Sequence, residues 1–337
     1  MDSASPIDPT PHPEQTLPHP RRFWWLTRLI ALTVLLAACV AGVRVWWGNV
    51  AERRMAAAIA DAHARGERIL ICDFATTQIV SDERNAAFYY RRAKQTLKTS
   101  NTQEWALDAT ETLPVRQDVF DITGEALKQN AAALADIRKA RECDQVDWNI
   151  AVRSPMWSVL LPDLNYVRQL ARITRAAGIH AAQRGDHRAA LEHAHDLHAI
   201  VRNINHQPFL ISHLVSVGID AMAADFVAEI TPNLRIADEG DAGKFAASRA
   251  QVRAVIDSLL NDQPRRDGMQ LALQSERAAQ VDTGNVMGSR ARLLRPSMQL
   301  DALRLVNEGK QLQAAARAPD WPAAQALFPV PLPNVQG

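Results

Sequence analysis

One long apolar run stands near the start of the chain. Residues 23–47, FWWLTRLIALTVLLAACVAGVRVWW, are apolar at almost every position and carry a tryptophan pair at each end, Trp24 with Trp25 and Trp46 with Trp47. At about 1.5 Å per helical residue the two pairs are roughly 33 Å apart, which matches a hydrocarbon core of about 30 Å. Tryptophan favours the two membrane interfaces. The run therefore predicts a transmembrane anchor.

Downstream of the anchor, apolar residues recur every three or four positions, which is typical of amphipathic helices. This period predicts an all-α domain, with one short strand at 68–72 (RILIC). The expected helices are 50–66, 83–98, 117–141, 158–183, 187–205, 207–231, 243–262, 266–282 and 290–316.

Two of these helices form a predicted hairpin. Residues 158–183 and 187–205 are separated only by a short turn that contains Gly185, and Asp186 occupies the N-cap position of the second helix. So short a turn makes the helices antiparallel. The small residues of the first helix, Gly178 among them, allow a neighbour to approach closely. We expect an antiparallel helical-hairpin bundle or a short α-solenoid.

The helix predicted at 207–231 is apolar nearly all round, which indicates a central buried helix. Asp220, Asp225 and Glu229 interrupt its apolar run, so we do not expect a second membrane span.

The chain divides into four predicted segments. Residues 1–22 are a disordered tail, since the first twenty residues contain six prolines. Residues 23–47 are the anchor, 48–318 the helical domain and 319–337 a proline-rich, extended C-terminus.

The composition argues against a nucleic acid partner and for a helical fold. The 337 residues include 38 basic and 37 acidic side chains, for a net charge of +1. A nucleic-acid-binding protein usually has a basic excess, so we expect no nucleic acid partner. Only 14 glycines are present, which favours helix over turn-rich β structure.

Cys39 allows a second interpretation of the apolar run. Small residues before a cysteine (LLAAC) also end a bacterial lipoprotein signal. Such a signal is followed by a polar tether, whereas here VAGVRVWW continues the apolar run, which favours an uncleaved anchor. We expect a single-pass protein of the bacterial inner membrane, with the short tail in the cytoplasm and the main domain on the exported side.

Histidines gather in one part of the chain: seven of the ten lie between His180 and His213. On a helical wheel only His195 and His198 are close neighbours. Glu192 and His195 have the Glu-x-x-His spacing of di-iron bundles, but such sites need a second pair, which the sequence lacks. We therefore predict no metal, no cofactor and no catalytic residue.

A basic stripe is predicted at Arg168, Arg172 and Arg175, which lie at i, i+4 and i+7 of one helix. It could bind an anionic ligand or an acidic partner, or pair with acidic residues of a neighbouring helix. The segment 240–245 (GDAGKF) resembles a phosphate loop but is too short, and we interpret it as a connection between helices.

Two cysteines remain after the anchor, Cys72 and Cys143. On the exported side they could form a disulfide; otherwise they are two free thiols.

Several segments carry a resemblance to known proteins. The segment 181–197 (AAQRGDHRAALEHAHDL) resembles the central part of a tetratricopeptide-type hairpin, although no 34-residue repeat is readable. Together with 85–93 (NAAFYYRRA), 143–148 (CDQVDW), 160–173 and 208–219, it resembles a group of uncharacterised bacterial proteins. The resemblance implies an N-terminal anchor and an all-helical exported domain.

Two functions follow from these patterns. The first is a membrane-anchored module that binds or scaffolds a protein partner at the cell envelope, as helical-hairpin arrays do. The alternative is a helical enzyme or small-ligand domain with a His/Arg site on 158–183 and 187–205.

Overall fold

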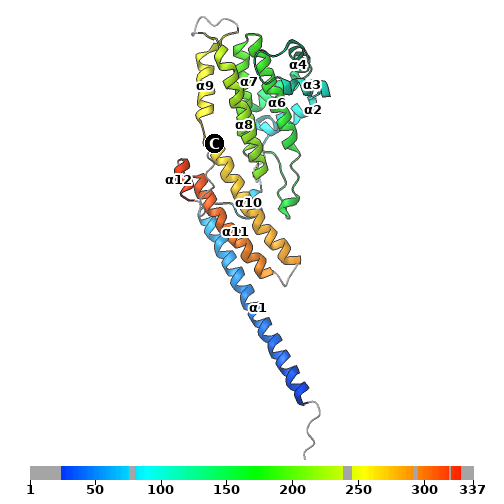
Figure 1. The fold of residues 1–337 in the computed structure, drawn as a ribbon, viewed down its shortest axis with the longest axis vertical. Helices are drawn as coiled ribbons and strands as arrows, with labels where there is room; N and C mark the ends of the chain where they lie inside the picture. The colour runs from blue at the N-terminus through cyan, green and yellow to red at the C-terminus, as the bar shows by residue number, and fades with distance from the viewer. Residues whose placement is uncertain (1–23, 76–79, 238–244, 291–294, 319, 328–337) are drawn as a thin grey trace, which may run out of the picture. The chain divides into compact units, whose positions relative to one another are not determined.

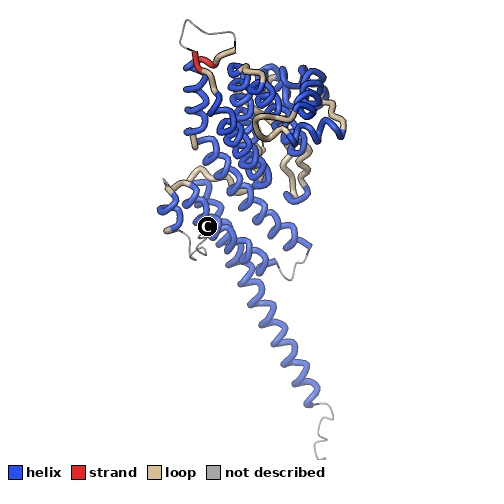
Figure 2. The backbone as a smooth tube through the Cα atoms, turned by 45° about the horizontal axis from the view of Figure 1, so that its top comes forward, coloured by secondary structure: helices blue, strands red, loops and turns tan. Residues whose placement is uncertain are grey.

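The computed structural model describes residues 24–75, 80–237, 245–290, 295–318 and 320–327. The chain forms two compact units, residues 1–50 and 51–337. Helices make up most of the described backbone (Figure 2), which confirms the all-α fold class. The predicted tail at 1–22 lies outside the described residues, as does most of the predicted extended C-terminus.

The first unit contains the start of helix α1 (Trp24–Ala64). This helix is long and apolar enough to cross a membrane, and its apolar side chains are uncovered: Leu32, Leu35 and Val43 are each more than 60% exposed. The helix predicted at 50–66 is present, but as the end of α1 and not as a separate helix, because α1 runs through that region without interruption. No proline breaks the chain between the two predicted segments.

The second unit contains the remaining helices (Figure 1). Their bounds are α2 (Ala86–Thr96), α3 (Asn101–Ala109), α4 (Gln117–Gln129), α5 (Ala131–Glu142), α6 (Asp163–Gln183), α7 (His187–Ile204), α8 (Leu210–Ile230), α9 (Arg249–Leu260), α10 (Gln263–Arg290), α11 (Arg295–Ala316) and α12 (Trp321–Gln325). Two-residue strands β1 (Ile236–Ala237) and β2 (Ala247–Ser248) pair in parallel, and 3-10 turns occupy Ile71–Phe74, Asp82–Arg84, Met156–Ser158 and Thr231–Asn233.

The predicted hairpin is present as α6 and α7, which pack side by side with α8 (Figure 1). Gly185 takes a left-handed φ of 76° in the turn, and the Asp186 side chain accepts a 2.9 Å hydrogen bond from the Ala189 amide as the N-cap. Gly178 lets Phe226 of α8 approach α6, since a Cβ there would lie 2.2 Å from the ring. The close-approach prediction is confirmed for α8.

Two of the predicted elements differ from the structure, and in each a polar side chain that binds backbone groups is the reason. The helix expected at 117–141 is two helices, because buried Asn130 at the junction exchanges hydrogen bonds with the backbone of Lys98. The strand expected at 68–72 is also wrong. There the Asp73 carboxylate accepts the amides of Ile69 and Leu70 at 2.9 Å and closes a 3-10 turn.

Helix α3 was not predicted; it begins at a capping box in which Ser100 and Gln103 bond each other's backbone amides. At the other end of the chain, residues 321–325 form α12 instead of the expected extended segment, and Asp320 caps it through the Ala323 amide. The predicted helix at 266–282 is longer, because α10 reaches Arg290.

Helix α8 is not the fully buried helix that its composition predicts. One face packs in the core through Val215, Ile219 and Phe226, which are each less than 5% exposed. The opposite face is uncovered: Ile211, Leu214 and Val217 are 48%, 56% and 46% exposed in the domain.

Candidate functional site

The two histidines that the sequence singles out line one cavity of about 320 Å³. His195 and His198 come from α7, where they are neighbours one turn apart, as the wheel predicts. The rest of the polar lining comes from α5, α7, α8, α9 and α10, through Arg141, Glu192, Arg202, Asp220, Ser258, Asn261 and Arg265.

One side of the cavity is a charge network between α5 and α7. Arg141 lies 2.8 Å from Glu192 and 3.1 Å from Asp196, and Arg138 lies 2.7 Å from Asp196. Burial raises the pKa of Asp196, but His193 and Arg138 outweigh it, so the pKa is lowered overall. Asp196 is therefore a buried anion held by two guanidiniums, and the network joins two helices rather than presenting free charge.

The other side joins α8 to α10. Arg265 lies 2.5 Å from Asp220, and the Asp220 carboxylate lies 3.9 Å from Nδ1 of His198. Nε2 of His198 is buried and has no hydrogen-bond partner among the described residues. This nitrogen is the unsatisfied polar atom of the site.

The surroundings of both histidines favour the neutral imidazole. Burial lowers the pKa of His195, and the charge of Arg141 adds to this. Burial also lowers the pKa of His198, against the opposing pull of Asp220. A neutral imidazole can both donate and accept a hydrogen bond, so the pair suits a polar ligand.

Comparison of the chain with known protein families, with curated proteins and with solved structures finds no match.

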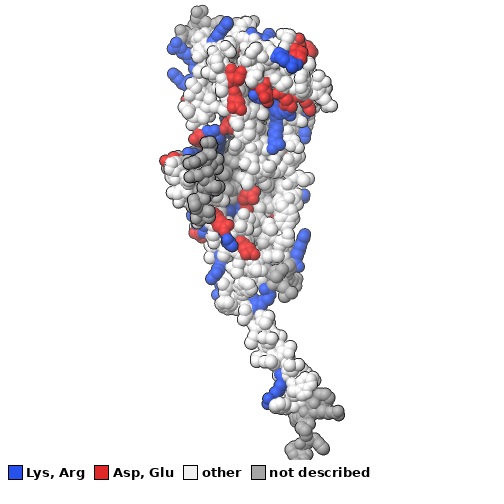
Figure 3. Space-filling view, viewed as in Figure 1, with Lys and Arg blue, Asp and Glu red and all other residues white. Residues whose placement is uncertain are grey.

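The Ser258 hydroxyl in the cavity wall donates within its own helix, to the Ala254 carbonyl at 2.8 Å. Over the described parts of the chain, no three His, Cys, Asp or Glu side chains converge as metal ligands. Acidic and basic side chains are interspersed over the face in Figure 3, as expected where charges pair with each other.

The arginine stripe is separate from this cavity, because none of its three residues lines it. Arg172 forms an ion pair with Asp108 of α3. Arg175 donates to the Glu111 carbonyl at 3.2 Å, and Arg168 is exposed. Two of its three arginines thus join α6 to α3 and to the loop after it.

Cys72 and Cys143 are free thiols in the structure. Cys72 lies on the 3-10 turn Ile71–Phe74 and is exposed. Cys143 caps α5, with Sγ 3.4 Å from the Lys139 carbonyl. A disulfide between them under oxidising conditions stays a prediction, to be checked by non-reducing peptide mapping.

A larger cavity of about 680 Å³ was not anticipated from the sequence. It is lined by the loop from Cys143 to Ile150 and shares Arg141 and Arg202 with the histidine cavity. Trp148 holds the loop in place: its ring stacks on Tyr90 with centroids 5.8 Å apart, and its indole nitrogen donates to the Asn203 carbonyl.

Sequence reasoning singled out Glu192 but missed the other charged residues around the histidines, Arg141, Arg202, Asp220 and Arg265. A signal was present: α5 carries Arg138 and Arg141 three residues apart, and α7 carries Glu192 and Asp196 four residues apart. Those spacings place each pair on one helix face. That the two faces meet follows only from the packing of α5 on α7.

Proposed function

We propose that this chain is a single-pass protein of the bacterial inner membrane whose helical domain, on the exported side, binds a protein partner. The α6–α7 pair serves in this proposal as a tetratricopeptide-like hairpin that supports the binding helix. The anchor is α1, whose apolar part is long enough to span a bilayer.

The exposed face of α8 carries the proposal. Ile211, Leu214 and Val217 recur at helical spacing and are each close to half exposed. Gly218 lies beside them, and a Cβ at that position would meet no atom within 4 Å. Contiguous apolar side chains on a folded domain are typical of protein interfaces, and a surface with a glycine lets a partner helix approach closely.

The apolar face does not make α8 a second membrane span. Its opposite side is domain core, where two of its acidic residues are engaged: Asp220 pairs with Arg265, and Glu229 accepts the Leu113 amide at 2.6 Å. Inserting α8 in lipid would break both contacts.

A photo-crosslinking amino acid at Leu214 of the full chain, in native membranes, tests the interface. Trp105 of α3 is the control, since it is similarly exposed at 49%. We expect a discrete protein adduct from Leu214 and none from Trp105, and its loss when Val217→Glu is added. The same adducts from both positions, or lipid adducts only, would contradict the proposal.

A second candidate function is binding of a small polar ligand at His195 and His198. The unpartnered Nε2 of His198 beside the 320 Å³ cavity favours it. The purified chain should bind a polar metabolite, detected as a shift in melting temperature across a metabolite panel. His198→Phe should abolish the shift, whereas His63→Phe, on an exposed part of α1, should not.

A further inference from the structure

The end of the α10–α11 hairpin meets α1 just after its apolar run. Arg295, the first residue of α11, lies 3.2 Å from Glu52 of α1. Glu52 follows Trp47 by only five positions in the sequence. Residues more than 240 positions apart in the chain thus lie together close to the proposed membrane surface.

An apolar cluster holds this arrangement. Met55 and Ala62 of α1 pack with Val281 of α10 and with Ala302 and Val306 of α11, and all five are buried. Gly288 lets the hairpin close, because a Cβ there would lie 3.0 Å from Cγ of Arg295. The hairpin end is therefore fixed beside α1 by packing as well as by the ion pair.

Positive charge is in excess at this end of the domain. Arg53 and Arg54 on α1 and Arg290 and Arg295 at the hairpin end are all exposed, and Glu52 is the acidic residue that pairs with Arg295. Arg53, Arg54 and Arg290 form no ion pair or hydrogen bond with any residue that the structure describes. Arginines elsewhere in the domain, such as Arg138 and Arg265, bind carboxylates of the chain itself.

We propose that Arg53, Arg54, Arg290 and Arg295 bind the headgroups of anionic phospholipids. The inference rests on the proposed anchor. Arg54 follows Trp47 by seven residues, a rise of about 10 Å, which is close to the Debye length of about 8 Å at physiological salt. Phosphate oxygens suit guanidinium groups, and basic residues next to a membrane span are attracted to anionic lipid.

The basic surface formed by Arg53, Arg54, Arg290 and Arg295 is shared by two elements of the domain. Because one half of the basic residues lies on α1 and the other half on the α10–α11 hairpin, lipid binding would engage both elements at once. The anchor helix by itself supplies only Arg53 and Arg54 to the surface.

Lipid retention by the full chain tests the proposal. The protein is reconstituted in vesicles of phosphatidylcholine with a minority of phosphatidylglycerol, and retained lipids are counted by native mass spectrometry. The variant Arg53→Gln/Arg54→Gln/Arg290→Gln keeps the Arg295–Glu52 ion pair. The control Arg184→Gln/Arg188→Gln/Arg253→Gln removes the same charge from exposed positions at the end of α6 and on α7 and α9.

We expect the wild type and the control to retain phosphatidylglycerol preferentially, and the test variant to lose the preference. The wild-type preference should also disappear at about 1 M salt, where the Debye length is about 3 Å. Equal retention of both lipids by the wild type, or an unchanged preference in the test variant, would contradict lipid binding by these arginines but not the membrane anchor. Release of the wild type by an alkaline carbonate wash would show that α1 is not a membrane anchor, and the lipid-binding proposal would then fail as well.

Discussion

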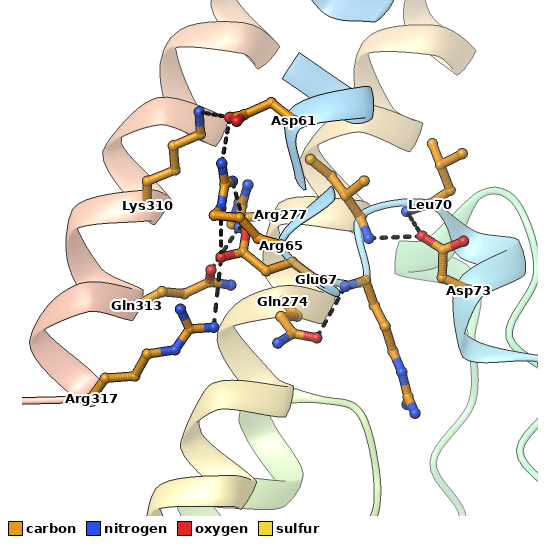
Figure 4. Close-up of polar contacts among 12 residues, drawn as sticks. Asp61, Arg65, Glu67, Leu70, Asp73, Gln274, Arg277, Lys310, Gln313 and Arg317 are labelled. Atoms are coloured by element: carbon orange, nitrogen blue, oxygen red, sulfur yellow. Dashed lines mark hydrogen bonds and ion pairs between the residues drawn. The ribbon is translucent and has the colours of Figure 1, made fainter. Parts of the chain in front are cut away.

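Arg277 donates a 2.7 Å hydrogen bond to Glu67, a residue 210 positions earlier in the chain. The two residues are 1% and 5% exposed. Arg277 also donates to Gln313 of α11, and Arg65 donates to both oxygens of the Glu67 carboxylate (Figure 4). Gly309 makes room for the guanidinium stem, since a Cβ there would lie 2.7 Å from Cγ of Arg277. This buried pair joins the segment after α1 to the α10–α11 hairpin.

Removing the carboxylate of this pair should cost more than removing the guanidinium. Glu67→Ala leaves the charge of Arg277 buried, and we expect a loss of about 3–5 kcal/mol in the free energy of unfolding. Arg277→Met should cost less, because Arg65 still pairs with Glu67. Denaturant unfolding measures both. Glu308→Ala on the exposed face of α11 is the control, at about 0–1 kcal/mol, and a larger loss for Arg277→Met than for Glu67→Ala would contradict this account.

Acid should weaken the same junction. Burial raises the pKa of Glu67, but hydrogen bonds from Arg65 and Arg277 outweigh burial and lower it from 4.5 to about 2. Because the pKa of Glu67 is lower in the folded state, its carboxylate stabilises the fold at pH values above 4.5. That stability is lost as the pH falls from 4.5 towards about 2. Glu67→Gln should flatten the stability curve over this range, as measured by urea unfolding at several pH values. An unchanged slope would show that Glu67 does not titrate there.

Two helix glycines should respond oppositely to alanine. Gly178→Ala places a methyl group 2.2 Å from the Phe226 ring, so we expect a loss of about 1–3 kcal/mol or more from overpacking. Gly218→Ala on α8 meets nothing and should stabilise by about 0.5–1 kcal/mol, since alanine favours helix. Thermal unfolding measures both changes. Phe226→Leu should recover part of the loss in Gly178→Ala; if it does not, the contact is not the cause.

The three arginines of the stripe should differ in how much each contributes to stability. Arg168→Gln and Arg172→Gln should each change stability by no more than about 1 kcal/mol, because Arg168 is exposed and the Arg172–Asp108 pair lies near the surface. Arg175→Gln should cost about 1–3 kcal/mol, since it removes the charged donor to the Glu111 carbonyl. Equal effects at all three positions in denaturant unfolding would contradict this division.

Cys39 should remain in an uncleaved helix. It lies inside α1, which continues for 25 further residues to Ala64 without a polar tether. Intact-mass measurement of the membrane-extracted protein should therefore give the full chain. A mass that lacks the first 38 residues and carries acyl chains would establish a lipoprotein instead.

Local patterns were enough for the elements that depend on neighbours in the chain. The apolar run of α1, the stripe of α7 and the Asp186 cap all follow from side chains within a few positions of each other. The break at Asn130 and the turn closed by Asp73 did not follow in the same way. Each depends on one polar side chain reaching particular backbone groups, which periodicity does not reveal.

What only the tertiary structure decided is which side chains meet across the domain. Composition makes α8 apolar all round, but packing determines that Phe226 is covered while Leu214 is exposed. Likewise, nothing near Arg277 or Arg295 in the sequence indicates that they pair with Glu67 and Glu52. A helix pattern records which face is apolar, whereas the partner of each face depends on how distant helices pack, because burial and ion pairing act between residues that are close in space.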